Sequence, residues 1–144
     1  MSQGSSPEIE RDELPLLVQA AAQGASELKA DDIVVLDVGD ILGVTDYFII
    51  ASAPNVRQVR RIAEEMEEHV KRAGGDGTSR AEGTREGMWV LLDFGAFIGH
   101  VFHTESRTFY DLERLWSEAP RHHWVDTAVR PGAPSRSLST TPRA

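Results

Sequence analysis

The chain has 144 residues, about the length of one domain that can bury a hydrophobic core without cross-links. It contains no cysteine, which excludes disulfides, thiolate metal sites and cysteine nucleophiles. The net charge is −8: residues 1–126 carry −11, from twelve basic and twenty-three acidic side chains, and residues 127–144 add three arginines. An acidic body repels phosphate backbones, so we expect no sequence-specific nucleic-acid binding and a basic protein as partner.

The ends of the chain predict tails rather than membrane segments. No apolar run approaches the roughly 20 residues that cross a bilayer, so we expect a soluble, cytoplasmic protein with no membrane contact. Residues 1–9 are mostly polar, and residues 119–144 are dominated by Ser, Thr, Pro and Arg toward their end. The sequence therefore predicts a disordered N-terminal tail, a folded domain over residues 10–118 and a mostly disordered C-terminal tail.

The first half of the domain predicts one helix followed by two strands. Apolar residues recur at helical spacing from Glu13 to Leu28, with alanine between them. Residues 33–38 form a β-branched run of strand length, and residues 45–51 form another. Because only a short glycine-containing loop connects them, we expect the two strands to be antiparallel neighbours.

A second helix is predicted after these strands. Ser52 is a candidate for its N-cap and Pro54 for a residue with a preset φ, while Gly74 and Gly75 end the helix. The charged residues on its other face are interpreted as a solvated surface. Its apolar positions repeat every three or four residues: Val56, Val59, Ile62, Met66 and Val70.

The second half of the domain predicts a β-hairpin. Residues 88–94 and 97–102 are apolar runs rich in strand-forming residues, and Gly95 lies where the chain must reverse. Strand alternation places Trp89 and Asp93 on one face, and neither face of the first strand is wholly polar. This pattern favours a central strand that is covered on both sides.

The rest of the domain completes a compact layered fold. Residues 74–87 contain four glycines and predict a loop, with a short edge strand near residues 78–81. Residues 110–116 have helical spacing. The order helix, two strands, helix, two strands, helix predicts an α/β or α+β fold.

Three side chains of the hairpin are candidates for chemistry. Asp93 and His100 could face each other as acid and base, but we favour an Asp93 that accepts hydrogen bonds from turn amides and a His100 satisfied by the backbone. His100 and His103 have an odd separation, which places them on opposite faces of a strand and argues against a metal pair. We therefore expect no catalytic residues, no cofactor and no metal.

The aromatic residues of the hairpin permit two interpretations. Trp89, Phe97 and Phe102 have the composition of a hydrophobic core and equally that of a protein-binding face. The residue types alone favour neither interpretation.

Three segments resemble the ribosomal silencing factor family, also called the Iojap or RsfS family. They are TDYFIIASAPNVRQVRRIA, EGTREGMWVLLDFGAFIGHVF and ESRTFYDLERLW, in the family's order and spacing within residues 10–118. The resemblance implies an α/β (α+β) fold with a mixed sheet flanked by helices, similar to nucleotidyltransferases but without their catalytic motif. It also implies a homodimer that binds ribosomal protein fourteen of the large subunit, blocks association with the small subunit and represses translation.

The resemblance also implies a set of partner-binding residues on the hairpin and the segment after it: Trp89, Asp93, Gly95, Phe97, His100, Phe102, Ser106, Arg107 and Tyr110. Two positions depart from the family pattern, because Ala96 replaces an acidic residue and Gly99 replaces a β-branched one. The alternative function is a nucleotidyltransferase-like or metal-dependent enzyme that uses Asp93 and His100. The absence of a phosphate loop and of a carboxylate pair from the sequence argues against it.

Overall fold

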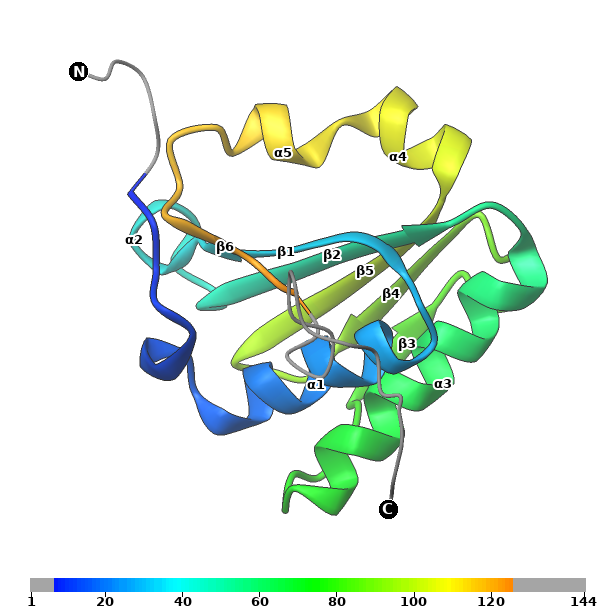
Figure 1. The fold of residues 1–144 in the computed structure, drawn as a ribbon, viewed down its shortest axis with the longest axis horizontal. Coiled ribbons are helices and arrows are strands. Elements are labelled where there is room, and N and C mark those ends of the chain that lie inside the picture. Colours follow the sequence, from blue (N-terminus) through cyan, green and yellow to red (C-terminus); the bar gives the residue numbers. More distant parts are fainter. Residues whose placement is uncertain (1–6, 126–144) are drawn as a thin grey trace, which may run out of the picture.

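The fold is a six-stranded mixed sheet with helices on both faces, shown by a computed structural model that describes residues 7–125 (Figure 1). The strands are β1 Asp31–Asp37, β2 Tyr47–Ala53, β3 Arg80–Glu82, β4 Trp89–Asp93, β5 Phe97–His103 and β6 Arg121–His123. The helices are a short 3-10 turn Arg11–Glu13, α1 Leu16–Glu27, α2 Gly39–Leu42, α3 Val56–Arg72, α4 Thr104–Tyr110 and α5 Leu112–Leu115. No helix in this part of the chain is long and apolar enough to cross a membrane.

The strand order is β3-β4-β5-β2-β1-β6. β2 and β5 are parallel, and every other neighbouring pair is antiparallel. Both predicted antiparallel pairs, β1 with β2 and β4 with β5, are therefore confirmed. The mixed sheet with its covering helices confirms the predicted α+β class.

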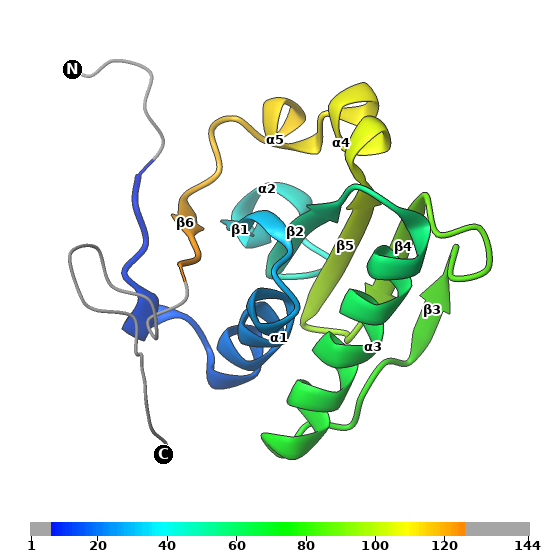
Figure 2. The same cartoon turned by 45° about the vertical axis from the view of Figure 1, so that its right-hand side comes forward.

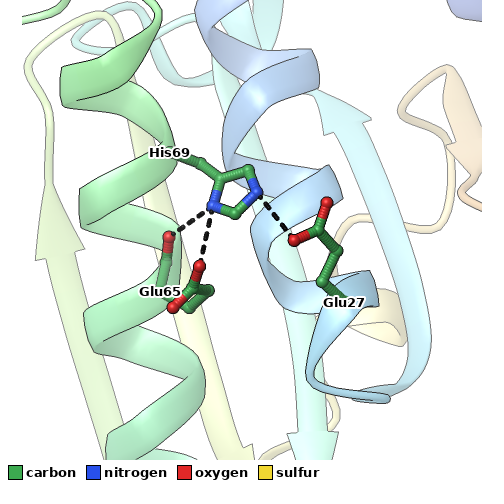
Figure 3. Close-up of side chains that lie close together, drawn as sticks. All are labelled: Glu27, Glu65 and His69. Atoms are coloured by element: carbon green, nitrogen blue, oxygen red, sulfur yellow. Dashed lines mark hydrogen bonds and ion pairs between the residues drawn. The ribbon is translucent and has the colours of Figure 1, made fainter. Parts of the chain in front are cut away.

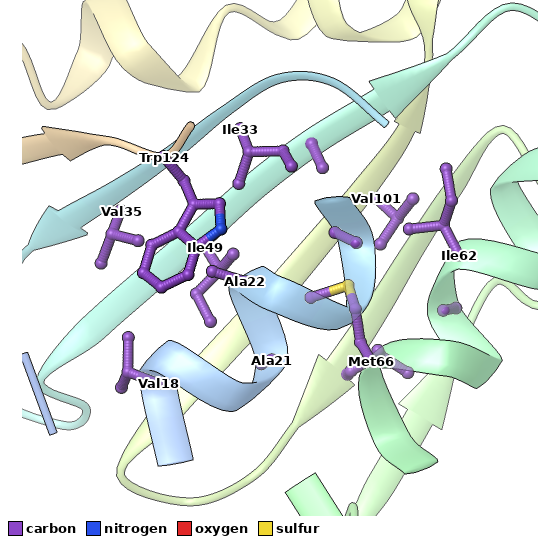
Figure 4. Close-up of a cluster of buried hydrophobic side chains, with 14 of the residues drawn as sticks. Val18, Ala21, Ala22, Ile33, Val35, Ile49, Ile62, Met66, Val101 and Trp124 are labelled. Carbon is purple, nitrogen blue, oxygen red and sulfur yellow. The ribbon is translucent and has the colours of Figure 1, made fainter. Parts of the chain in front are cut away.

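Helices α1 and α3 cover one face of the sheet, and α4 and α5 lie across the other (Figure 2). The main core fills the space between the sheet and the first helix pair, with Val18 of α1, Ile62 and Met66 of α3 and Ile49 of β2 almost fully buried (Figure 4). Because strand side chains alternate, the intervening residues of β1 and β2 form a second cluster beneath α5. β1 and β2 are thus buried on both faces.

The start of α3 differs from the prediction. β2 continues to Ala53, so Ser52 is a buried strand residue rather than a helix cap. The N-cap is Asn55, whose side-chain oxygen accepts a hydrogen bond from the backbone N–H of Gln58 at 2.9 Å. The cap is therefore placed three residues later than predicted.

The single helix expected over residues 110–116 is two helices with a break between them. Asp111 has a φ of +51°, outside the helical region, and separates α4 from α5. α4 begins directly after β5, where the Nδ1 atom of His103 accepts a hydrogen bond from the backbone N–H of Glu105. The sequence pattern revealed the apolar face of α5 but not the turns before it.

The packed part of the chain continues beyond the expected boundary at residue 118. β6 pairs with β1, and Trp124 lies in the main core with the Arg11 guanidinium 3.6 Å from its ring centroid. The expected boundary is too early, because a three-residue strand carries too little periodicity to be recognised. Residues 1–6 and 126–144, which include most of both predicted tails, lie outside the described residues.

Candidate partner-binding surface

The face of the sheet opposite α1 and α3 is only partly covered at β4 and β5. Trp89, Leu91 and Asp93 of β4 are half-buried on this face, whereas Val90 and Leu92 are buried on the other. Leu112 and Trp116 of the α5 segment pack over the cluster that β1 and β2 form, and Trp89 packs against the same cluster. The predicted covering of both faces of β4 is therefore incomplete.

Four apolar side chains line this open region, and we call them the aromatic surface: Trp89, Leu91, Phe109 and Tyr110. The Tyr110 ring centroid lies 4.7 Å from that of Trp89 and 5.0 Å from that of Phe109. Tyr110 is 50% exposed and Phe109 is 79% exposed, which is unusual for such large apolar groups. Beside them, Glu82, Gly83, Trp89 and Leu91 line a shallow hollow of about 260 Å³.

His100 lies beneath the aromatic surface and holds Trp89 in place. The indole Nε1 of Trp89 donates a hydrogen bond to the Nδ1 of His100 at 3.1 Å. The ring of Phe48 packs edge-on against the imidazole, with 4.6 Å between the two ring centroids. Burial lowers the pKa of His100 from 6.5 to about 4, because the apolar surroundings disfavour the charged ring. The ring is therefore neutral at pH 7, with its proton on Nε2, which has no partner among the described residues.

Arg107 fixes α4 and α5 to the sheet. Its Nε and Nη2 atoms donate to both carboxylate oxygens of Glu113, at 3.2 and 2.9 Å. Nη1 donates to the Ser52 hydroxyl and to the Asp31 carbonyl, and Nη2 donates to the Asp32 carbonyl. One buried guanidinium thus joins the two helices and the ends of two strands, and it sets the position of Tyr110.

The side chains at the turn of the hairpin stabilise the turn and are not arranged for catalysis. Asp93 accepts a hydrogen bond from the backbone N–H of Gly95 at 2.8 Å, as the sequence predicted. Gly95 has a φ of +92°, and its carbonyl accepts from the Thr45 hydroxyl. Asp93 is paired with Ile98 in the ladder, two positions from His100, so the carboxyl and the imidazole do not form an acid and base pair.

The structure separates the nine predicted partner-binding residues into two groups. Trp89, Asp93, Gly95 and Tyr110 reach the surface. Five others are interior residues, each at most 9% exposed: Phe97, His100, Phe102, Ser106 and Arg107. Phe97 is furthest from the expectation, since it faces the opposite core and stacks on Phe94 at 4.6 Å.

Two members of the aromatic surface were missed from the sequence. Leu91 was assigned to a covered strand face, and Phe109 belongs to α4, which was not predicted. Phe109 lies in a helix that starts directly after a strand, and this position is the signal that could have revealed it. The helical spacing recognised in the sequence begins one residue later, at Tyr110.

The arrangement of the described residues is suited to binding. Asp93 is engaged in the turn and His100 is buried, so neither is placed to act on a bound substrate. In the described part of the chain, the one group of side chains spaced to hold a metal is Glu27, Glu65 and His69, on the far side of the sheet. The fold and this surface define an α+β protein that presents aromatic side chains on one face of a mixed sheet.

Comparisons with known proteins identify the family. The sequence model of "Ribosomal silencing factor during starvation" matches residues 11–143. A ribosomal silencing factor RsfS of Bacillus subtilis is 38% identical over 104 residues, which cover 72% of this chain and 87% of that protein. The chloroplastic protein Iojap of Zea mays is 37% identical over 68% of this chain and 42% of its own length.

Solved structures share the fold. A crystal structure from Bacillus halodurans is 34% identical, with a TM-score of 0.64 over 74% of this chain and 95% of that chain. One from Chromobacterium violaceum is 29% identical, with a TM-score of 0.68 over 88% and 98%. The chain belongs to the ribosomal silencing factor (RsfS) family, whose members are non-enzymatic regulators with a ribosome-associated partner.

Proposed function

We propose that this protein binds ribosomal protein fourteen of the large ribosomal subunit through the aromatic surface and blocks association with the small subunit, which represses translation. The observation that carries the proposal is the exposed pair Phe109 and Tyr110 beside Trp89, on a domain of the silencing-factor family. Exposed apolar side chains that gather in one patch mark interaction sites, and aromatic residues such as Trp and Tyr are enriched among the residues that dominate binding.

Trp89 and Tyr110 of the aromatic surface are held by contacts within the protein. Trp89 is held by its hydrogen bond to His100 and by ring contacts with Phe102 at 4.8 Å and Tyr110 at 4.7 Å. Arg107 holds the helix that carries Tyr110. Side chains that are already ordered lose little conformational entropy on binding, so most of their buried apolar area contributes to affinity.

Two acidic side chains lie beside this apolar centre. Glu82 lines the hollow beside Trp89 and forms an ion pair with Arg80 at 2.9 Å, and Asp93 lies two residues from Leu91 on the same strand face. The net charge of the chain, −8, favours a basic partner. A negatively charged protein attracts a basic ribosomal protein and speeds its encounter, while the aromatic side chains supply most of the affinity.

The proposed roles of the nine predicted residues follow from their burial. Trp89 and Tyr110 contact the partner, and Asp93 and Gly95 shape the edge of the surface. His100, Phe102, Ser106 and Arg107 position these contacts from below, whereas Phe97 supports the opposite core. A bulky domain held in this way inhibits by occupying the place of the small subunit, without any chemical step.

The proposal extends to a homodimer that acts in the cytoplasm, where bacterial ribosomes are assembled. Both points rest on membership of the family. Sedimentation equilibrium of the full chain tests the first point, with a mass of twice 15.9 kDa expected. A monomer at the concentrations that inhibit translation would contradict it.

A pull-down with purified ribosomal protein fourteen tests the proposed function. We expect Tyr110→Ala to weaken binding by about 2 kcal/mol, or roughly thirtyfold, as for a central aromatic contact. Leu16→Ala is the matched control, because Leu16 is 77% exposed but lies on α1 at the opposite face. Equal binding by the wild type and Tyr110→Ala, with both folded by circular dichroism, would contradict the proposed surface.

A further inference from the structure

The edge strand β3 places two charged side chains beside the aromatic surface. Arg80 stands opposite Asp93 in the β3–β4 ladder, and Glu82 stands opposite Leu91. Residues that are directly opposite in an antiparallel pair project from the same face of the sheet, so both charged side chains share a face with Leu91 and Trp89. All residues of β3 are exposed. A basic and an acidic side chain therefore lie next to the aromatic surface.

The hollow beside Trp89 is small, with a volume of about 260 Å³, and is lined by Glu82, Gly83, Trp89 and Leu91. Gly83 permits this shape, because it has a φ of +80° and lies so close to β4 that a Cβ atom would clash with the carbonyl oxygen of Trp89. The volume is below the range of about 300–1,000 Å³ that is typical of small-molecule sites. The hollow is therefore of a size for one side chain of a partner rather than for a small-molecule ligand.

The lining of the hollow is mostly apolar and contains one carboxylate. Trp89 and Leu91 supply the apolar part, and the side chain of Glu82 is 56% exposed. Lysine and arginine fit this combination, because their side chains bury an apolar stem and keep a cationic head in contact with water. An acidic side chain would be repelled by Glu82, and a purely apolar one would remove water from the carboxylate without replacing its hydrogen bonds. The lining is thus complementary to a basic side chain.

We propose that the hollow receives one lysine or arginine side chain of the ribosomal partner and that Glu82 selects it. The stem packs against Trp89 and Leu91, and the cationic head donates a hydrogen bond to the Glu82 carboxylate, which is roughly twice as strong as a bond between neutral groups. This role of Glu82 rests on the proposed function, since it assigns one side chain of the same partner to the same surface. Glu82 is then a specificity-determining residue that recognises charge, whereas Tyr110 supplies apolar contact.

Arg80 occupies the Glu82 carboxylate while no partner is bound. The Arg80 Nε atom lies 2.9 Å from that carboxylate, and the Arg80 side chain is 65% exposed. An ion pair between exposed side chains contributes little to stability, so a cation of the partner can replace Arg80 at small cost. Asp93 stands opposite Arg80 and uses one carboxylate oxygen in the turn, so its other oxygen can accept the displaced guanidinium. Arg80 is therefore an internal competitor of the partner, and its removal should raise the affinity.

Calorimetric titration of purified ribosomal protein fourteen into the full chain tests the roles of both residues. Glu82→Gln should weaken binding about tenfold through loss of a charge-assisted hydrogen bond, and Glu27→Gln should not. The control removes the same charge from a 48% exposed side chain at the end of α1, on the opposite face, where the carboxylate faces His69 (Figure 3). Arg80→Ala should strengthen binding about threefold by freeing Glu82. Arg72→Ala is its control, because this 62% exposed arginine pairs with a carboxylate of α3 instead.

A double-mutant cycle identifies the side chain that enters the hollow. Each lysine and arginine of protein fourteen is replaced by alanine in turn, and one of these changes should weaken binding to the wild type but cause no further loss in Glu82→Gln. Circular dichroism confirms that each variant is folded.

The variant Tyr110→Ala separates failure of this assignment from failure of the proposed function. If Tyr110→Ala binds weakly but Glu82→Gln binds like Glu27→Gln, or if no basic residue of the partner is coupled to Glu82, the assignment of the hollow is overturned and the proposed function stands. Equal affinities of Arg80→Ala and Arg72→Ala would refute the role of Arg80 as a competitor. If Tyr110→Ala binds like the wild type, the aromatic surface is not the binding site and both proposals fail.

Discussion

Replacing Arg107 with methionine tests whether this residue positions the aromatic surface or contacts the partner. The guanidinium side chain is 10% exposed and donates five hydrogen bonds, two of them to Glu113, whose side chain is 30% exposed. Methionine keeps much of the volume but leaves Glu113 and two strand carbonyls without a donor. Removing one partner of a buried ion pair costs about 3–5 kcal/mol, and we expect about 3 because Glu113 is partly solvated.

Urea unfolding followed by circular dichroism measures this loss, with Arg114→Met as the control. Arg114 is an exposed neighbour on α5 and should cost less than about 0.5 kcal/mol. Binding to ribosomal protein fourteen should fall in Arg107→Met, since α4 is no longer fixed. A stability loss below about 1 kcal/mol, together with strongly reduced binding, would refute the positioning role and indicate a direct contact.

Three further predictions concern other parts of the fold. Because burial lowers the pKa of His100 from 6.5 to about 4, the unfolded chain binds more protons between these values, and stability should fall by about 2 kcal/mol from pH 7 to pH 5. Urea midpoints at the two pH values, compared with those of His100→Gln, should show a smaller change in the variant. Gly24→Ala should cost about 1–3 kcal/mol in the same assay, because its Cβ would lie 2.8 Å from the Glu65 carbonyl oxygen; a neutral change would contradict the close helix crossing. Asn55→Ala should cost about 1 kcal/mol through loss of the α3 cap, and an unchanged urea midpoint would contradict a cap at Asn55.

The central elements of the fold could be predicted because each carries its own periodic signal. α3 repeats apolar residues every three or four positions, and the strands of both antiparallel pairs are rich in β-branched and aromatic residues. The edge of the sheet at β6 could not be predicted, because this strand has three residues and gains its stability from pairing with β1. The burial of Trp124 could not be predicted for the same reason, because this side chain enters the core only in the folded sheet.

The candidate surface could be predicted in part. The resemblance pointed to Trp89 and Tyr110, which do lie at the surface. It could not show that Arg107 is buried, because its partners Asp31 and Ser52 are 76 and 55 residues away in the chain. Arginine is usually exposed, so a buried one is recognised only from the tertiary structure.

The cluster around His69 illustrates the same limit on the other face. Glu65 was interpreted as part of a solvated helix face, yet its side chain is only 20% exposed. Glu27 lies on a different helix, and nothing in the local sequence relates it to α3. The close approach at Gly24 brings them together, and that approach is a property of the packed helices.

A subunit-joining assay tests the central claim most directly. Purified large subunits are incubated with increasing amounts of the protein before small subunits are added, and joining is followed by light scattering. Inhibition should saturate near one copy per large subunit, be absent for ribosomes that are already assembled, and be lost in Tyr110→Ala but kept in Leu16→Ala. Inhibition at much less than one copy per subunit that grows with incubation time, or equal inhibition by Tyr110→Ala, would contradict occlusion through the aromatic surface.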